Sequence, residues 1–172
     1  MMSTNYEFKN SRKIKSKFLS QRRAASILIV DDDPDFLHLV FQHVSKIECA
    51  EIDVAESCEE AVAKLTNRHF SLVICDWSLA TRTGPEVFHL ADPLLLTTCG
   101  PNGKIPVMFM SGSEKVACTQ NLSAYKNFEP VTFIIKNLGA KMIRIMAENV
   151  LRYRNSTPSE RGNFGTDRYY QA

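Results

Sequence analysis

The stretch Ile27–Phe36, ILIVDDDPDF, carries the pattern from which the fold is predicted. Its first four residues form a continuous apolar run, which is typical of a strand that is covered on both faces. Three aspartates end the run, and Pro34 stands where the first turn of a helix accepts proline. From Phe36 onward, apolar residues recur at helical spacing. The stretch therefore predicts a buried strand followed directly by an amphipathic helix.

The same alternation recurs along the chain. A capping-box pair, Ser57 and Glu60, opens one further helical pattern, and apolar residues from Met142 to Leu151 predict a last helix that ends near Arg154. Further buried strands are predicted at Ile52–Ala55, Leu72–Cys75, Val107–Met110 and Val131–Ile135. Five such alternations predict an α/β fold, a doubly wound, flavodoxin-like parallel sheet with strand order 2-1-3-4-5 and helices on both faces.

Composition places the chain among soluble globular proteins. It has 172 residues, of which 44% are apolar and 23% charged. No apolar run approaches the roughly 20 residues of a membrane helix, so we expect no membrane span. The five cysteines are scattered without a C-x-x-C pair, and no histidine joins them at zinc spacing. This use of cysteine indicates a reducing compartment, and we expect a cytoplasmic location.

Charge is unevenly distributed. Residues 1–26 contain seven lysines and arginines against one glutamate, a net +6, whereas the whole chain carries +2. We interpret residues 1–24 as a basic flexible tail, residues 25–153 as one domain and residues 154–172 as a flexible C-terminal tail. A basic arm for an acidic partner and a transit peptide remain alternatives for the first segment. Direct binding to nucleic acid is not expected.

Polar side chains stand where the predicted strands end. The first strand ends in an acidic group, the third in Asp76, the fourth in Ser111 and the fifth in Lys136. Because parallel strands present their carboxyl ends at one edge, we expect Asp31, Asp32 and Asp76 to converge there. Any one of these residues alone is compatible with an ordinary turn or cap. The joint pattern predicts a site.

The residue types at this edge predict a phosphoryl site. Converging carboxylates repel one another, and a hard divalent cation such as Mg²⁺ relieves that repulsion. Lys136 supplies an amine and Ser111 a hydroxyl for an anion, and the backbone N–H groups of Ser78 and Gly112 complete the cradle. An aspartate is a competent nucleophile toward a phosphoryl group, whose transfer depends mainly on positioning and charge neutralisation.

With these residues in place, the sequence resembles the receiver domain of two-component response regulators over about residues 25–153. The resemblance is carried by ILIVDDDPDF with the acidic pair Asp31 and Asp32, by LVICDWSLATRTG with Asp76 and Gly84, by IPVMFMSGS with Ser111 and Gly112, and by FIIK with Lys136. Phe133 falls where the family often has a switch aromatic.

The resemblance implies a function as a stand-alone phosphoacceptor. A histidine kinase or histidine phosphotransfer protein would donate a phosphoryl group to Asp76. Mg²⁺ would be bound by Asp32, Asp76 and the backbone carbonyl of Ser78, with Asp31 reaching it through water. Ser111 and Lys136 would hold the phosphoryl oxygens. Movement of Ser111 and Phe133 would then change the surface offered to a downstream target protein, without enzymatic turnover beyond self-catalysed phosphorylation and dephosphorylation.

The sequence departs from the family pattern in two kinds of place. Asn137 stands directly after Lys136, where the family usually has proline. Ala80 replaces another usual proline, a few residues past Asp76. The segments His89–Lys104 and Ser113–Pro130 are longer than typical, and both are expected near the output surface. These departures bear on how the domain signals more than on its phosphorylation chemistry.

Three alternatives remain open on the sequence alone. A receiver-like scaffold would keep the fold and act only through protein contacts. A haloacid-dehalogenase-type phosphatase would use Asp31 and Asp33 as its D-x-D motif, but it leaves Asp76 without a role. A flavin- or nucleotide-binding domain is disfavoured because the acidic loop after the first strand repels phosphate.

Overall fold

The computed structural model describes residues 25–48, 50–95, 103–113 and 125–156. Residues 1–24 and 157–172, which belong to the two predicted tails, lie outside this part. In chain order the elements are β1 (Ala25–Val30), α2 (Pro34–Val44), β2 (Ala50–Ala55), α3 (Cys58–Asn67), β3 (Leu72–Asp76), α4 (Gly84–Ala91), η1 (Asp92–Leu94), β4 (Ile105–Ser111), β5 (Phe128–Ile135), η3 (Lys136–Leu138) and α5 (Ala140–Asn155).

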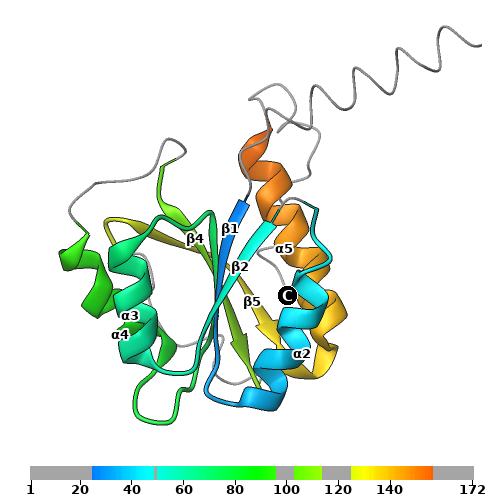
Figure 1. Cartoon of the computed structure of the whole chain (residues 1–172), viewed down its shortest axis with the longest axis horizontal. Coiled ribbons are helices and arrows are strands. Elements are labelled where there is room, and N and C mark those ends of the chain that lie inside the picture. Colours follow the sequence, from blue (N-terminus) through cyan, green and yellow to red (C-terminus); the bar gives the residue numbers. More distant parts are fainter. Residues whose placement is uncertain (1–24, 49, 96–102, 114–124, 157–172) are drawn as a thin grey trace, which may run out of the picture.

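The five strands form one parallel sheet in the order β2-β1-β3-β4-β5, which confirms the predicted topology. In Figure 1 the strands run toward the lower edge of the molecule, so their carboxyl ends lie together there. The register sets Val30 opposite Cys75 and Asp76 opposite Met110. The strand ends that carry the predicted site therefore lie side by side at one edge.

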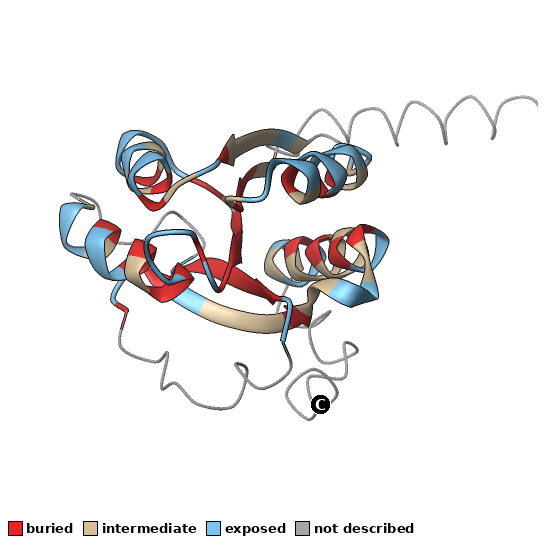
Figure 2. Ribbon diagram, turned by 90° about the horizontal axis from the view of Figure 1, so that it is seen from below, coloured by how far each residue is buried: buried red, intermediate tan, exposed pale blue. Residues whose placement is uncertain are grey.

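Helices cover both faces of the sheet, with α2 and α5 on one side and α3 and α4 on the other (Figure 1). Figure 2 shows buried residues concentrated on the sheet and on the helix faces turned toward it. Alternate residues of one strand face opposite layers. Leu28 and Val30 of β1 pack toward α3 and α4, whereas Ile27 and Ile29 pack toward α2 and α5.

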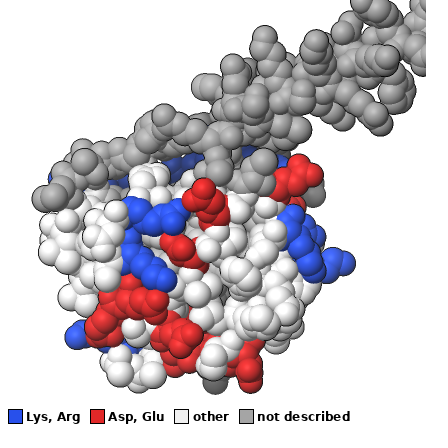
Figure 3. Space-filling model, viewed as in Figure 1, with Lys and Arg blue, Asp and Glu red and all other residues white. Residues whose placement is uncertain are grey.

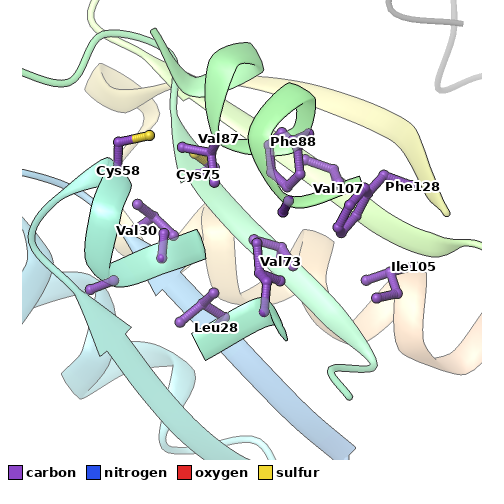
Figure 4. Packing of buried hydrophobic residues seen from close by; sticks show 14 of the residues in the cluster. Leu28, Val30, Cys58, Val73, Cys75, Val87, Phe88, Ile105, Val107 and Phe128 are labelled. Atoms are coloured by element: carbon purple, nitrogen blue, oxygen red, sulfur yellow. The ribbon is translucent and has the colours of Figure 1, made fainter. Parts of the chain in front are cut away.

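The α3–α4 layer is built partly from aromatic rings. Val87 and Phe88 of α4 point onto the sheet, as Figure 4 shows. The ring of Phe88 meets Phe109 at a centroid distance of 5.6 Å and Phe128 at 4.9 Å, both nearly edge to face. These rings join α4 to β4 and β5 on one face of the sheet.

Polar caps fix where the first two helices begin. The carboxylate of Asp33 accepts hydrogen bonds from the N–H groups of Asp35 and Phe36 and so caps α2, with Pro34 in its first turn. The hydroxyl of Ser57 accepts from the N–H of Glu60 at 3.2 Å, which confirms the predicted cap of α3.

Strand β5 begins earlier than predicted. The sequence pattern starts it at Val131, but pairing with β4 begins at Phe128 and runs through Pro130. Proline lacks the N–H that a central strand needs, but it is tolerated at a sheet edge. The register shifts opposite Val107 and Met108, so Val131 is left out of the one-to-one pairing.

Parts of the two lengthened segments, residues 96–102 and 114–124, lie outside the described residues. Helix α5 continues to Asn155, two residues past the predicted end of the domain. Within the described ranges, none of the helices is long and apolar enough to cross a membrane.

Candidate functional site

Asp76 is the last residue of β3, and its backbone is held on both sides. The next residue, Trp77, donates its N–H to Met110 O at 2.7 Å and accepts at its carbonyl from Gly84 N–H at 2.7 Å. A Cβ on Gly84 would lie 2.2 Å from the carbonyl oxygen of Asp76. The start of α4 can therefore approach the Asp76 backbone only because residue 84 is glycine. Asp76 itself is 6% exposed.

Asp31 follows β1 and is completely buried. Its backbone N–H donates to Ala55 O at 3.1 Å, which continues the sheet pairing past the strand. Its Oδ1 accepts from the N–H of Asp33 at 3.1 Å. The carboxylate is thus fixed by the loop that connects β1 to α2, and it points to the edge where β3 and β5 also end.

Lys136 joins the two buried carboxylates. Its Nζ lies 2.8 Å from Oδ2 of Asp31 and 2.7 Å from Oδ2 of Asp76. The Lys136 side chain is 18% exposed, so the three groups form a mostly desolvated ionic cluster. The structure therefore brings together the ends of β1, β3 and β5, as the sequence predicts.

Burial and charge shift the protonation equilibria in this cluster. Burial raises the pKa of Asp31 from 3.8 to about 6, with a smaller upward contribution from the charge of Asp76, while Lys136 works in the opposite direction. For Lys136, burial lowers the pKa, but hydrogen bonds and charge from the two aspartates outweigh it and the pKa is raised. The single ammonium therefore does not neutralise the negative charge of the aspartates in this cluster.

The carboxylates of Asp31, Asp32 and Asp76 fit a hard divalent cation. One oxygen of each lies within 4.8 Å of the others. Although Oδ2 of Asp31 is near Lys136, it receives no hydrogen bond of acceptable geometry and is buried. Oxygen ligands and an excess of two negative charges over the single ammonium suit Mg²⁺. In Figure 3, acidic side chains also gather along the lower edge, where the strands end.

Asp33, the third aspartate of the acidic loop, caps helix α2 and lies outside the oxygen cluster. The Asp33 carboxylate is occupied in capping α2 through the N–H groups of Asp35 and Phe36, at 3.0 and 3.2 Å. It is exposed and does not belong to the oxygen cluster of the three other aspartates. The D-x-D arrangement that a phosphatase of the haloacid-dehalogenase type requires is therefore not formed by Asp31 and Asp33.

Ser111 ends β4 one residue beyond Met110, the β4 partner of Asp76. It is 3% exposed, and its hydroxyl is engaged with its own loop. Oγ donates to the carbonyl of Ser113 and accepts from the N–H of Ser113, both at 3.1 Å. Gly112 is exposed between them, and a Cβ on it would meet nothing within 4 Å. This hydroxyl must exchange partners before it can donate to a bound anion.

The loop that follows Asp76 is closed without the proline that the family usually has there. Ser78 pairs with Thr83 as an isolated antiparallel bridge, and Leu79 N–H donates to Arg82 O at 2.9 Å. Ala80 lies within this narrow hairpin. After β5, Asn137 lies within the short turn η3, which Gly139 ends at φ +82°. Both departures from the family pattern are accommodated by local hydrogen bonding.

Three aromatic contacts at the site were not predicted. The centroid of the Trp77 ring lies 5.3 Å from that of Phe133 and 5.2 Å from that of Phe109, so the residue after Asp76 contacts the candidate switch aromatic. The ring of Phe36 lies 4.7 Å from Nζ of Lys136. The sequence shows that Phe36 is an apolar residue of α2, but no local signal shows that its ring reaches the lysine.

A family profile described as "Response regulator receiver domain" matches residues 27–148. A search of curated proteins gave no significant match.

Among solved structures, the chain is similar to a CheY-like response regulator receiver domain protein from Methanospirillum hungatei JF-1. The two share 24% identity and a TM-score of 0.57, over 76% of this chain and 95% of the other. It is also similar to response regulator protein TrrA from Thermotoga maritima in complex with Mg²⁺-BeF, with 21% identity and a TM-score of 0.55 over 73% and 98%. At these identities the similarities establish the fold.

Proposed function

The chain belongs to the response regulator receiver domain family, and we propose that it accepts a phosphoryl group on the carboxylate of Asp76. The donor is a phosphohistidine of a histidine kinase or histidine phosphotransfer protein. In the transfer, the P–N bond of the donor breaks and an O–P bond to Asp76 forms. The domain is then a substrate that assists its own phosphorylation, and it does not turn over a separate substrate.

The observation that carries the proposal is the shared ammonium of Lys136, at 2.8 Å from Asp31 and 2.7 Å from Asp76. A positive charge therefore lies beside the carboxylate that would attack phosphorus in this proposal. An ammonium there stabilises charge on the phosphoryl oxygens in the transition state, where electrostatic positioning supplies most of the catalysis. Asp76 is 6% exposed, and a donor would approach it from the carboxyl edge of the sheet.

The remaining residues take supporting roles in this proposal. Asp31, Asp32 and Asp76, with the backbone carbonyl of Ser78, would hold Mg²⁺. When bound, Mg²⁺ supplies charge neutralisation for the phosphoryl oxygens. The N–H groups of Ser78 and Gly112 would donate to the phosphoryl group.

We further propose that Ser111 is part of the switch. Its hydroxyl would leave Ser113 to donate to a phosphoryl oxygen. Phe133 would move with it, because its ring packs on Trp77 beside the acceptor. The change would alter the surface near β5 and α5 that a cytoplasmic target protein reads. The population of the switched state then depends on the extra hydrogen bonds made only with the phosphoryl group.

The test uses the phosphoryl analogue beryllofluoride and the small donor acetyl phosphate. We expect a Mg²⁺-dependent change in Trp77 fluorescence with beryllofluoride, and covalent addition of one phosphoryl group with acetyl phosphate, detected by intact-mass spectrometry. Both responses should be lost in Asp76→Asn and retained in Asp33→Asn, which changes an aspartate of the same acidic loop that only caps α2.

The outcomes separate the alternatives. A folded wild-type protein that responds to neither reagent would overturn phosphoacceptance and favour the scaffold. Sustained hydrolysis of a generic phosphate ester would favour the phosphatase, which the capping role of Asp33 already disfavours.

A further inference from the structure

The ammonium of Lys136 contacts the ring of Phe36, which has no role in the proposed phosphoryl chemistry. Two carboxylates, from Asp31 and Asp76, contact it at hydrogen-bonding distance. The ring of Phe36 lies 4.7 Å from the same nitrogen. The ammonium is therefore contacted by two anions and by one aromatic face.

The position of this ring is fixed by the acidic loop. Phe36 lies in the first turn of α2, and its N–H donates to Oδ1 of Asp33 at 3.2 Å. The N–H of Asp33 in turn donates to Oδ1 of Asp31 at 3.1 Å. The ring and the buried carboxylate are thus joined through two consecutive hydrogen bonds on one short segment. A single local structure presents both an anion and an aromatic face to Lys136.

A lysine needs such support if its charge is to be held in one place. Its ammonium sits on a flexible four-carbon chain and is strongly hydrated, so ion pairing alone leaves several geometries open. An aromatic face attracts a cation through its quadrupole, more strongly where water is excluded. The Lys136 side chain is 18% exposed, so much of that water is already removed.

Phe36 also has an ordinary packing role, because it is partly buried and packs against the core between the sheet and helices α2 and α5. Another apolar side chain would serve that packing as well. Only an aromatic ring accounts for the contact with the ammonium. The two roles therefore predict different results for Phe36→Leu, which keeps the side chain apolar but removes the ring.

We propose that Phe36 is a positioning residue, whose ring holds the Lys136 ammonium against Asp31 and Asp76 and so prepares it to meet the phosphoryl oxygens. The contact between ring and ammonium stands on the geometry alone. Its consequence for phosphoryl binding rests on the proposed function.

The test compares three variants. Phe36→Leu keeps an apolar side chain and removes the ring, and Phe36→Tyr keeps the ring. Phe41→Leu is the matched control, because it removes another phenylalanine of α2 that is 37% exposed. Five residues along a helix place it about 140° around the axis from Phe36.

The first measurement is independent of phosphorylation. Protons near an aromatic face experience a ring-current shift, so the terminal CH₂ and ammonium resonances of Lys136 should be displaced in the NMR spectrum of the wild type. We expect Phe36→Leu to abolish that displacement, and Phe36→Tyr and Phe41→Leu to retain it. Lys136 resonances that are the same in wild type and Phe36→Leu would overturn the inference, even if the protein proves not to be a phosphoacceptor.

The second measurement is the midpoint of a beryllofluoride titration at saturating Mg²⁺, followed by Trp77 fluorescence. We expect Phe36→Leu to weaken beryllofluoride binding about three- to ten-fold, in line with the loss of one partly desolvated cation–π contact. Phe36→Tyr should bind as the wild type does. If Phe36→Leu lowers the melting temperature while the midpoint stays at the wild-type value, the ring serves only packing and the positioning role is wrong. A wild type that does not respond at all contradicts the proposed function, and the NMR comparison then decides the contact.

Discussion

Nζ of Lys136 lies 2.7 Å from Oδ2 of Asp76, although 60 residues separate them in the sequence. The same nitrogen contacts Asp31, which is 105 residues away. Strand order makes both contacts possible, because β3 lies between β1 and β4 and β5 completes the sheet. Two carboxylates that share one ammonium form a site whose stability and chemistry both depend on the balance of charge.

Removing the ammonium should destabilise the fold. Lys136→Met leaves Asp31 and Asp76 buried beside each other without a counter-charge, and breaking a buried pair in this way costs about 3 kcal/mol. Chemical denaturation at neutral pH without Mg²⁺ measures the loss. Saturating Mg²⁺ should restore part of the stability, since it supplies positive charge to the same oxygens. A variant as stable as the wild type would show that the carboxylates are not under electrostatic stress.

Removing the negative charge of Asp76 should have the opposite effect and stabilise the fold. The charge of Asp76 helps to raise the pKa of Asp31, which shows that the two carboxylates repel each other. Asp76→Asn removes that repulsion and keeps an oxygen that can accept a hydrogen bond from Lys136. We expect a melting temperature higher by a few degrees in the presence of a chelator. An unchanged or lower melting temperature would count against a crowded acidic pocket.

Asp31 predicts a specific dependence of stability on pH. Its pKa in the folded protein is about 6, above the ordinary 3.8, so between these values the folded state binds more protons than the unfolded state. The contribution of Asp31 to stability therefore decreases as pH rises from about 4 to about 6 and is constant above that.

The variant Asp31→Asn lacks this titration. Its unfolding free energy relative to the wild type should rise by up to about 3 kcal/mol across the same window, at about 1.4 kcal/mol per pKa unit. Denaturant titrations of both proteins without Mg²⁺, at several pH values, measure this difference. A difference that does not change with pH would mean that Asp31 titrates normally.

Mg²⁺ should stabilise the protein through Asp32 and not through Asp33. A ligand that binds only the folded state raises the melting temperature in proportion to the logarithm of its concentration above Kd. We expect Asp32→Asn to abolish most of this increase, because Asp32 belongs to the oxygen cluster. Asp33→Asn should keep it, since asparagine caps a helix about as well as aspartate. Equal losses in both variants would place the ion elsewhere in the acidic loop.

Gly84→Ala should destabilise the protein by displacing the backbone of Asp76. The added Cβ would lie 2.2 Å from the carbonyl oxygen of Asp76 and 3.2 Å from Sγ of Cys75, so strand β3 or helix α4 must move. Overpacking of this kind costs roughly 1–3 kcal/mol. Gly112→Ala is the control for stability, because a Cβ there meets nothing within 4 Å. Comparable unfolding free energies for the two variants would show that α4 is not held tightly against Asp76.

Much of the architecture is predictable because its signals are local. Continuous apolar runs and helical spacing reveal strands and helices wherever they occur, and the predicted strand order is confirmed. The start of β5 is predicted too late, at Val131, because Pro130 is a poor strand residue except at an edge. Whether a strand lies at an edge is a property of the assembled sheet.

The site is predictable only in part. Asp31, Asp76 and Lys136 are found from the sequence because each stands where a strand ends, and parallel strands end together. Two features could not be found in this way. The bonds of Ser111 to Ser113 depend on loop conformation, and the contact of Phe36 with Lys136 depends on how α2 is rotated against β5.

The sequence by itself determined the alternation of strands and helices and the identity of the side chains at the carboxyl edge, because neighbouring residues alone set those patterns. Only the tertiary structure decided how these side chains share charge. One ammonium contacts two carboxylates, a ring from α2 lies against it, and burial raises the pKa of Asp31 to about 6. Such properties depend on separations of a few ångströms between residues far apart in the chain, and on the removal of water by the two helix layers around them.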